Sequence, residues 1–137
     1  MQKLRSKAKL VKDLRIVVDN GRTHSVCLDL PAELGTDMGP TALELGVMSY
    51  AGCFATTFAL MAKKMRVQLK DLEVSLEALK SEEVGTVTEA VFDILVKTDA
   101  AESVVQRIFK LTVENCPVGK LFERAGVKVA YNIKTLK

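Results

Sequence analysis

Short apolar runs separated by polar turn residues open the chain, a pattern typical of β-strands. Residues 14–19 and 23–30 are rich in strand-forming residues, and an earlier, shorter strand is expected within residues 3–10. Asn20-Gly21 lies between the runs at 14–19 and 23–30 and favours a hairpin turn, because both residues tolerate a positive φ. A loop rich in Gly and Pro is expected over residues 31–40.

Alternation of apolar and polar residues predicts three further strands in the second half of the chain. The alternating stretches lie at residues 72–78, 86–97 and 127–133. The Glu82–Gly85 segment separates the first two stretches and is expected to form a hairpin turn between them.

Three other segments have the spacing of helices. Residues 41–64 are apolar on nearly every side, which is typical of a helix in a protein core or between subunits. The next segment has a narrower apolar stripe, and Asp99 with Glu102 at its start resembles a capping box. The last segment covers residues 117–124, begins with a proline and is followed by Gly126, as expected at the two ends of a short helix.

These elements alternate in an order that defines the expected fold. Strands precede a helix, two strands follow it, and two helices lead to a last strand. The order predicts an α+β fold with an antiparallel sheet and a long buried central helix. The length of 137 residues, without an internal repeat or linker, indicates a single domain over residues 1–137.

Composition and charge narrow the possible partners. Since the chain has no Trp, five Phe and two Tyr, its core is expected to consist of Val, Leu, Ile, Ala and Met. The net charge of +3 is spread along the chain without a long basic block, so no nucleic-acid partner is expected. The charged N-terminus has no apolar run of the kind found in secretory signals.

One stretch reaches the lower length limit of a membrane-spanning helix. Residues 45–62 contain no charge, but Ser, Tyr, Gly and Thr interrupt them, so a buried helix is preferred and no membrane partner is expected. The three cysteines are widely spaced and odd in number, which indicates a reducing, cytoplasmic compartment. His24 is the only histidine, so no metal site is expected.

Two cysteines are candidates for chemistry. Cys53 lies in the long apolar helix, where a cysteine is commonly a small buried apolar residue and where a reactive thiolate needs a cation from elsewhere. Cys116 precedes Pro117 and falls at a helix N-cap, where free N–H groups and the helix dipole lower a thiol pKa. The alternative is that Cys116 marks a structural kink. Cys27 is interpreted as an incidental strand residue.

A single carboxylate stands near the start of the long helix. Glu44 is the only charged residue between Asp37 and Lys63. It has a structural explanation, because a negative charge stabilises the positive end of the helix dipole. A functional role for Glu44 requires a basic partner nearby.

Two motifs contain these candidate residues. Residues 39–45 (GPTALEL), followed by residues 51–53 (AGC), resemble the GP-x-P-x-EL…GC core of the OsmC/Ohr family. Residues 116–118 (CPV) are similar to the family's second signature, a Cys-Pro-Val late in the chain. The resemblance covers essentially the whole chain, and the two motifs occur in the family's order.

The resemblance implies a thiol-dependent peroxidase that reduces small organic hydroperoxides without a metal, a flavin or another cofactor. Cys53 matches the peroxidatic cysteine and Cys116 the resolving cysteine, with which Cys53 would form a disulfide. Glu44 matches the carboxylate that holds a catalytic arginine.

The arginine itself is expected near the first hairpin. An arginine beside the sulfur would stabilise the thiolate and hydrogen-bond the departing oxygen. We choose Arg15 for this role, with Lys12 and Arg22 as alternatives.

The resemblance also implies partners: a dithiol reductant such as a lipoyl group, and a second copy of the chain in an intertwined homodimer. Glu44 and Cys53 are nine positions apart, so they face opposite sides of one straight helix. They share a site only if the helix breaks at Gly46 or Gly52, or if one of them comes from another chain. Two other functions stay open, a non-enzymatic binder of small apolar ligands on the same fold and a structural dimer with incidental cysteines.

Overall fold

The computed structural model describes residues 1–137, which form two compact units, Met1–Gly46 (unit 1) and Val47–Lys137 (unit 2). Unit 1 contains an antiparallel sheet in the order β1-β2-β3. Its strands are β1 (Lys7–Lys12), β2 (Arg15–Asp19) and β3 (Ser25–Leu28). Gly21 has a φ of 75° between β2 and β3, which confirms the predicted hairpin turn.

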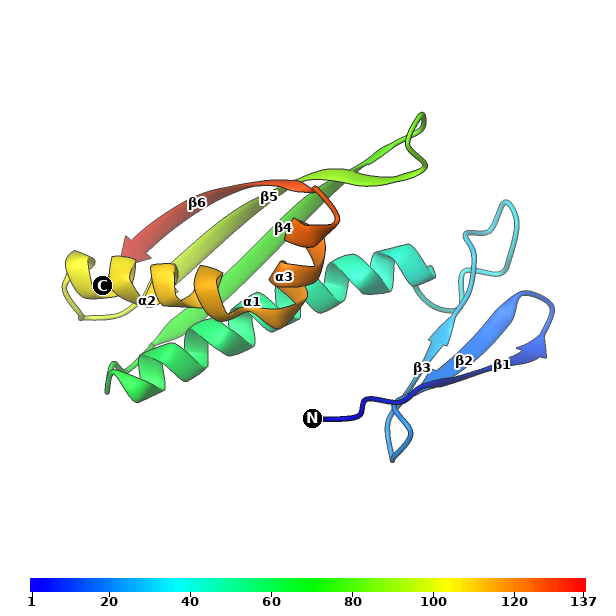
Figure 1. Ribbon diagram of the computed structural model, residues 1–137, viewed down its shortest axis with the longest axis horizontal. Coiled ribbons are helices and arrows are strands. Elements are labelled where there is room, and N and C mark those ends of the chain that lie inside the picture. The colour runs from blue at the N-terminus through cyan, green and yellow to red at the C-terminus, as the bar shows by residue number, and fades with distance from the viewer. The chain divides into compact units, whose positions relative to one another are not determined.

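Unit 2 is a three-stranded sheet with helices on one face (Figure 1). The strands are β4 (Asp71–Ser81), β5 (Thr86–Lys97) and β6 (Lys128–Leu136). The helices are α1 (Ala42–Lys64), whose first residues belong to unit 1, α2 (Glu102–Asn115) and α3 (Pro117–Arg124). The α+β class predicted from the sequence is therefore confirmed, and the single domain over residues 1–137 stays a prediction.

The last strand differs from the expected antiparallel sheet. β4 and β5 are antiparallel and joined by a turn in which Gly85 has a φ of 82°. β6, however, pairs with β5 in parallel. The two helices between these strands make a crossover long enough for a parallel return. Alternation of apolar residues carries no information on strand direction, so the sequence could not predict this pairing.

The expectation of a purely aliphatic core is wrong. All seven aromatic residues of the chain pack in the core of unit 2. Phe92, on β5, lies at the centre of this group, with ring centroids 4.8 Å from those of Tyr50 and Phe54 and 5.3 Å from that of Tyr131. The few aromatic residues are concentrated in one core and dominate it. The composition of the whole chain could not show this concentration.

α1 runs without a break at Gly46 or Gly52. Its buried side packs against the core of unit 2, whereas Met48 and Leu60 are 55% and 51% exposed. Within a single chain the long helix is therefore buried on one side, and its other side is exposed. By length and composition alone, α1 is long and apolar enough to cross a membrane.

The helix boundaries are confirmed for α3 and corrected for α2. Asp99 does not cap α2, which begins after Ala101 without a side-chain cap. The Asp99 carboxylate instead accepts a hydrogen bond of 2.9 Å from Lys70 Nζ, which lowers the pKa of Asp99. α3 begins at Pro117, and Gly126 follows it with a φ of 84°.

Candidate active site

Unit 2 brings together the two cysteines that the sequence singled out. Cys53 lies on α1 and is half-buried, and Cys116 lies between α2 and α3 and is buried. Their sulfur atoms are 3.3 Å apart, and the thiol of Cys116 donates a hydrogen bond to Cys53 Sγ. A disulfide requires sulfurs about 2.0 Å apart, so a small local movement is sufficient to join them.

Pro117 is the reason that Cys116 occupies this position. A proline disfavours helical geometry in the residue before it, so α2 ends and Cys116 adopts an extended backbone with φ of −76° and ψ of 107°. The same proline starts α3, and Cys116 Sγ accepts a hydrogen bond of 3.4 Å from the backbone N–H of Gly119. The N-cap position predicted for Cys116 is thus confirmed.

The expected lowering of the Cys116 pKa is wrong. Burial raises the pKa of the Cys116 thiol to about 11, and the hydrogen bond that it donates to Cys53 acts in the same direction. The backbone N–H groups of Gly119 and Val118 oppose this shift but do not outweigh it. Cys116 therefore keeps its proton at neutral pH.

A cavity of about 240 Å³ in unit 2 lies against Cys116 but not against Cys53. It is lined by residues of all three helices, β6 and the turn before β6, namely Tyr50, Phe54, Val113, Cys116, Gly119, Glu123, Val127, Val129 and Tyr131. Burial raises the pKa of both tyrosine hydroxyl groups in this lining, those of Tyr50 and Tyr131. The sequence reasoning missed these residues, because only the fold gathers them around Cys116.

Gly119 lies close to both the Tyr50 ring and the sulfur of Cys116. A Cβ at this position would stand 3.2 Å from Tyr50 Cε1 and 3.3 Å from Cys116 Sγ. The tyrosine ring and the sulfur therefore flank the glycine closely, and any larger side chain would displace one of them.

Arg15 is held by two neighbours within unit 1. Its Nε donates a hydrogen bond of 3.0 Å to Thr36 Oγ1 and lies 3.9 Å from Asp29 Oδ2. Asp29 accepts further hydrogen bonds from the Thr36 hydroxyl, at 2.6 Å, and from the N–H groups of Leu30 and Met38. Because the Thr36 hydroxyl and the Met38 N–H stabilise the carboxylate, the pKa of Asp29 falls to about 2.

Glu44 caps the start of α1. Its Oε1 accepts a hydrogen bond of 2.9 Å from the N–H of Thr41, and the N–H of Glu44 donates to Thr41 Oγ1 at 3.1 Å. This is a capping box, which the spacing of Thr41 and Glu44 in the sequence could have revealed. No ion pair joins Glu44 to Arg15, whose carboxylate partner is Asp29. A role of Glu44 in holding the arginine stays a prediction.

The remaining candidates take part in fewer contacts. Cys27 lies on β3, and its Sγ is 3.8 Å from the carbonyl oxygen of Leu28. The side chains of Lys12 and Arg22 are exposed and form no ion pair. Among the three basic residues considered, Arg15 alone is fixed by its neighbours.

This geometry defines a class of protein: an α+β protein with a close but unequal pair of thiols, of which one is protonated and buried and the other is half-buried. Such a pair supports reversible formation of an intramolecular disulfide.

The comparison with protein-family models assigns the family. Residues 35–132 match the model of the OsmC-like protein family, and the chain belongs to this family. No curated protein sequence matches the chain significantly.

Solved structures have the same fold at low sequence identity. The OsmC-like protein of Mycoplasma pneumoniae is 17% identical, with a TM-score of 0.88 over 99% of both chains. The organic hydroperoxide resistance protein OsmC of Legionella pneumophila is 18% identical, with a TM-score of 0.73 over 98% of both chains. The organic hydroperoxide resistance protein OhrB of Bacillus subtilis is 21% identical, with a TM-score of 0.65 over 97% of this chain and 98% of that one.

Proposed function

We propose that this protein is a thiol peroxidase that reduces small organic hydroperoxides, with Cys53 as the peroxidatic and Cys116 as the resolving cysteine. The observation that supports this most directly is the 3.3 Å contact in which the Cys116 thiol donates to Cys53 Sγ. Membership of the OsmC-like family and the structural likeness to two organic hydroperoxide resistance proteins support the same reaction class.

The proposed cycle has two chemical steps before reduction. The Cys53 thiolate attacks the terminal peroxide oxygen, the O–O bond breaks, and the alkoxide leaves as an alcohol after taking up a proton. Cys53 is now a sulfenic acid. Cys116 then attacks Cys53 Sγ, a disulfide forms, and the sulfenic oxygen leaves as water with the proton that Cys116 gives up.

Arg15 is the proposed cation for the Cys53 site. Its Nε contacts Thr36 and Asp29, so one edge of the guanidinium is fixed while its other nitrogen atoms form no hydrogen bond or ion pair within unit 1. A guanidinium held in this way loses little freedom when it binds a sulfur or an oxygen anion. Lys12 and Arg22 lack such support and are the alternatives.

The proposed assembly is a homodimer. In unit 2, the exposed side of α1 presents Met48, Gly52, Thr56 and Leu60 at intervals of four residues, a stripe that a second copy of the chain could cover. A dithiol is the proposed reductant, and the cytoplasm is the proposed compartment, because the cycle requires a steady supply of reduced thiols.

Mass spectrometry after one equivalent of cumene hydroperoxide tests the proposal. We expect the protein to lose two hydrogen atoms, cumyl alcohol to form in equal amount, and peptide mapping to find a Cys53–Cys116 bridge. Cys27→Ser provides the control and should react identically. Unmodified thiols would instead favour a non-enzymatic binder of apolar ligands, and a bridge that contains Cys27 would contradict the assigned roles.

A further inference from the structure

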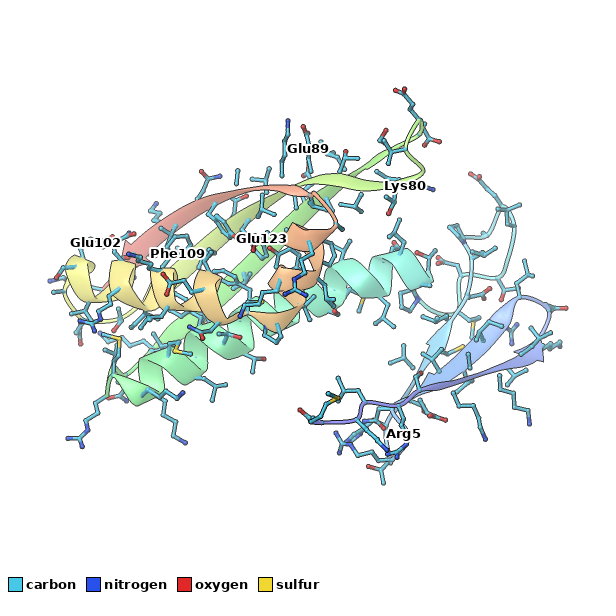
Figure 2. The ribbon with its side chains drawn as sticks, in the orientation of Figure 1. Arg5, Lys80, Glu89, Glu102, Phe109 and Glu123 are labelled. Carbon is cyan, nitrogen blue, oxygen red and sulfur yellow. The ribbon has the colours of Figure 1, made fainter.

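The cavity beside Cys116 is not needed for the attack of Cys53 on peroxide. It is lined by Cys116, by Glu123 on α3 (Figure 2) and by the hydroxyl-bearing rings of Tyr50 and Tyr131, whereas Cys53 does not line it. A small molecule in this cavity would therefore meet the resolving sulfur without passing the peroxidatic one.

We propose that this cavity is the access route of the reducing thiol, that the thiol attacks Cys116 Sγ of the oxidised pair, and that it is a small neutral or cationic thiol. This inference rests on the proposed peroxidase cycle, in which a Cys53–Cys116 disulfide is the species to be reduced.

The chemistry of disulfide exchange supports attack on Cys116. A thiolate attacks one sulfur in line with the bond that breaks, and the other sulfur leaves with the negative charge. Attack on Cys116 expels Cys53, whereas attack on Cys53 would expel Cys116. Because burial raises the pKa of Cys116 to about 11, Cys116 is a poor leaving group.

The steps conserve electrons and protons. The thiolate forms a bond to Cys116 Sγ, the Cys53–Cys116 bond breaks, and Cys53 leaves as a thiolate. A second thiol, or the second arm of a dithiol, then attacks the sulfur of the bound reductant and releases Cys116, which takes up a proton. Two thiols are oxidised to one disulfide, and their two electrons reduce the protein disulfide.

The lining of the cavity indicates the class of thiol. A volume of about 240 Å³ admits a small molecule but not a bulky tripeptide with several charges. Glu123 lines the cavity, so its carboxylate places a negative charge at the cavity wall. That charge repels an anionic thiol and attracts a cationic one.

Three thiols of similar size and different charge test this point: mercaptoacetate, 2-mercaptoethanol and cysteamine. The disulfide is formed beforehand with diamide, so the test does not depend on peroxidase activity, and failure of the peroxide reaction is scored separately. For each thiol the readout is the rate constant of reduction in Glu123→Gln divided by that in the wild type, which removes differences in intrinsic reactivity.

At a separation of about 7 Å in water-like surroundings, loss of one charge changes such a rate about threefold. Because the attacking sulfur carries the same negative charge in all three thiols, we expect the ratio to fall about threefold from mercaptoacetate to mercaptoethanol and about threefold again from mercaptoethanol to cysteamine. Glu114→Gln, an exposed residue of α2 outside the cavity, should give ratios near one for all three thiols. Equal ratios for all three thiols in Glu123→Gln would overturn the proposed role of the cavity.

A second variant tests the access route by size. Val113→Trp adds bulk at the part of the cavity formed by α2, where Val113 is partly exposed. We expect reduction of the disulfide by mercaptoethanol to slow about tenfold, because the rate of thiol–disulfide exchange depends on access to the attacked sulfur. Single-turnover oxidation by peroxide should slow less. Leu121→Trp, on the exposed side of α3, is the control. An unchanged reduction rate in Val113→Trp, or an equal loss in both reactions, would overturn the proposed route.

Discussion

The thiol of Cys116 donates a hydrogen bond to the sulfur of Cys53 across 3.3 Å, so the two cysteines are unequal before any peroxide arrives. The donor keeps its proton because burial raises its pKa to about 11. The acceptor is the half-buried sulfur on α1. This asymmetry assigns the two thiols to different steps of the proposed cycle.

Serine variants are expected to separate these steps. Cys53→Ser should abolish peroxide reduction, because a hydroxyl is a far weaker nucleophile than a thiolate at neutral pH. Cys116→Ser should still reduce one equivalent of peroxide and retain a sulfenic acid on Cys53, detectable with dimedone and mass spectrometry. Normal turnover of Cys116→Ser with dithiothreitol would mean that an external thiol resolves Cys53 directly, and the role given to Cys116 would weaken.

Disulfide formation should depend strongly on pH. Only the thiolate of Cys116 attacks a sulfenic acid, and with a pKa of about 11 its fraction rises about tenfold per pH unit between about pH 7 and 10. Stopped-flow measurement after rapid oxidation by one equivalent of peroxide gives this rate directly. A rate that levels off near pH 8 would show that Cys116 loses its proton much more easily than its burial implies.

Glu44→Gln distinguishes a structural from a chemical role of this carboxylate. Glutamine also serves in a capping box, so the variant should be as stable as the wild type to urea. If Glu44 also holds the arginine, as the family resemblance implies, the peroxidation rate should fall about tenfold or more, since a charged hydrogen bond is replaced by a neutral one.

Thr41→Ala is the matched control for the cap. It should lower the free energy of unfolding by about 1 kcal/mol, because the N-cap side chain is lost, and leave the peroxidation rate nearly unchanged. A fully active Glu44→Gln would leave Glu44 with its capping role alone.

The support of Arg15 should weaken in acid. The folded-state pKa of Asp29 is about 2, below its ordinary value of 3.8, so the folded form favours the carboxylate. The stabilisation that Asp29 contributes is therefore complete above about pH 4 and is lost as the pH falls toward 2. In Asp29→Asn, unfolding between pH 4 and 2 should depend less on pH than in the wild type, as circular dichroism would measure. An identical acid transition in both proteins would contradict a stabilising role for the hydrogen bonds that Asp29 accepts.

Association through α1 is expected to produce a dimer. Sedimentation equilibrium at low micromolar concentration should give twice the mass of the chain, 15.0 kDa. Met48→Glu places a charge in the exposed stripe and should shift the equilibrium toward the monomer. Val91→Glu, at an exposed apolar position on β5, should leave the mass unchanged. A folded, active monomer of the wild type would rule out both the dimer and a site shared between subunits.

Local sequence signals predicted the elements well, because each rests on residues close together in the chain. Pro117 alone fixed both the end of α2 and the start of α3, and Asn20-Gly21 fixed the first hairpin. The two-motif resemblance predicted the pairing of Cys53 with Cys116, which are 63 positions apart and are joined only by the fold.

Features that depend on the surroundings of a residue could not be predicted in this way. The N-cap position of Cys116 indicated a lowered pKa, but burial by aromatic residues from distant segments outweighs the backbone N–H groups. Likewise, nothing near Arg15 in sequence indicated that Thr36 and Asp29 would hold it. The direction of β6 depends on the crossover before it and not on the residues of the strand.

The parallel pairing of β6 with β5 has a consequence for the way the chain matures. During synthesis both thiols leave the ribosome before the C-terminal strand, which supplies Val129 and Tyr131 beside Cys116. Pairing across a long crossover is slow, because the entropic cost of closing the loop comes before the contacts that offset it. A nascent chain therefore passes through a stage in which Cys116 is present without its buried environment. The burial that raises the pKa of Cys116 is complete only when the last strand docks, so completion of the sheet is what makes the two cysteines an unequal pair.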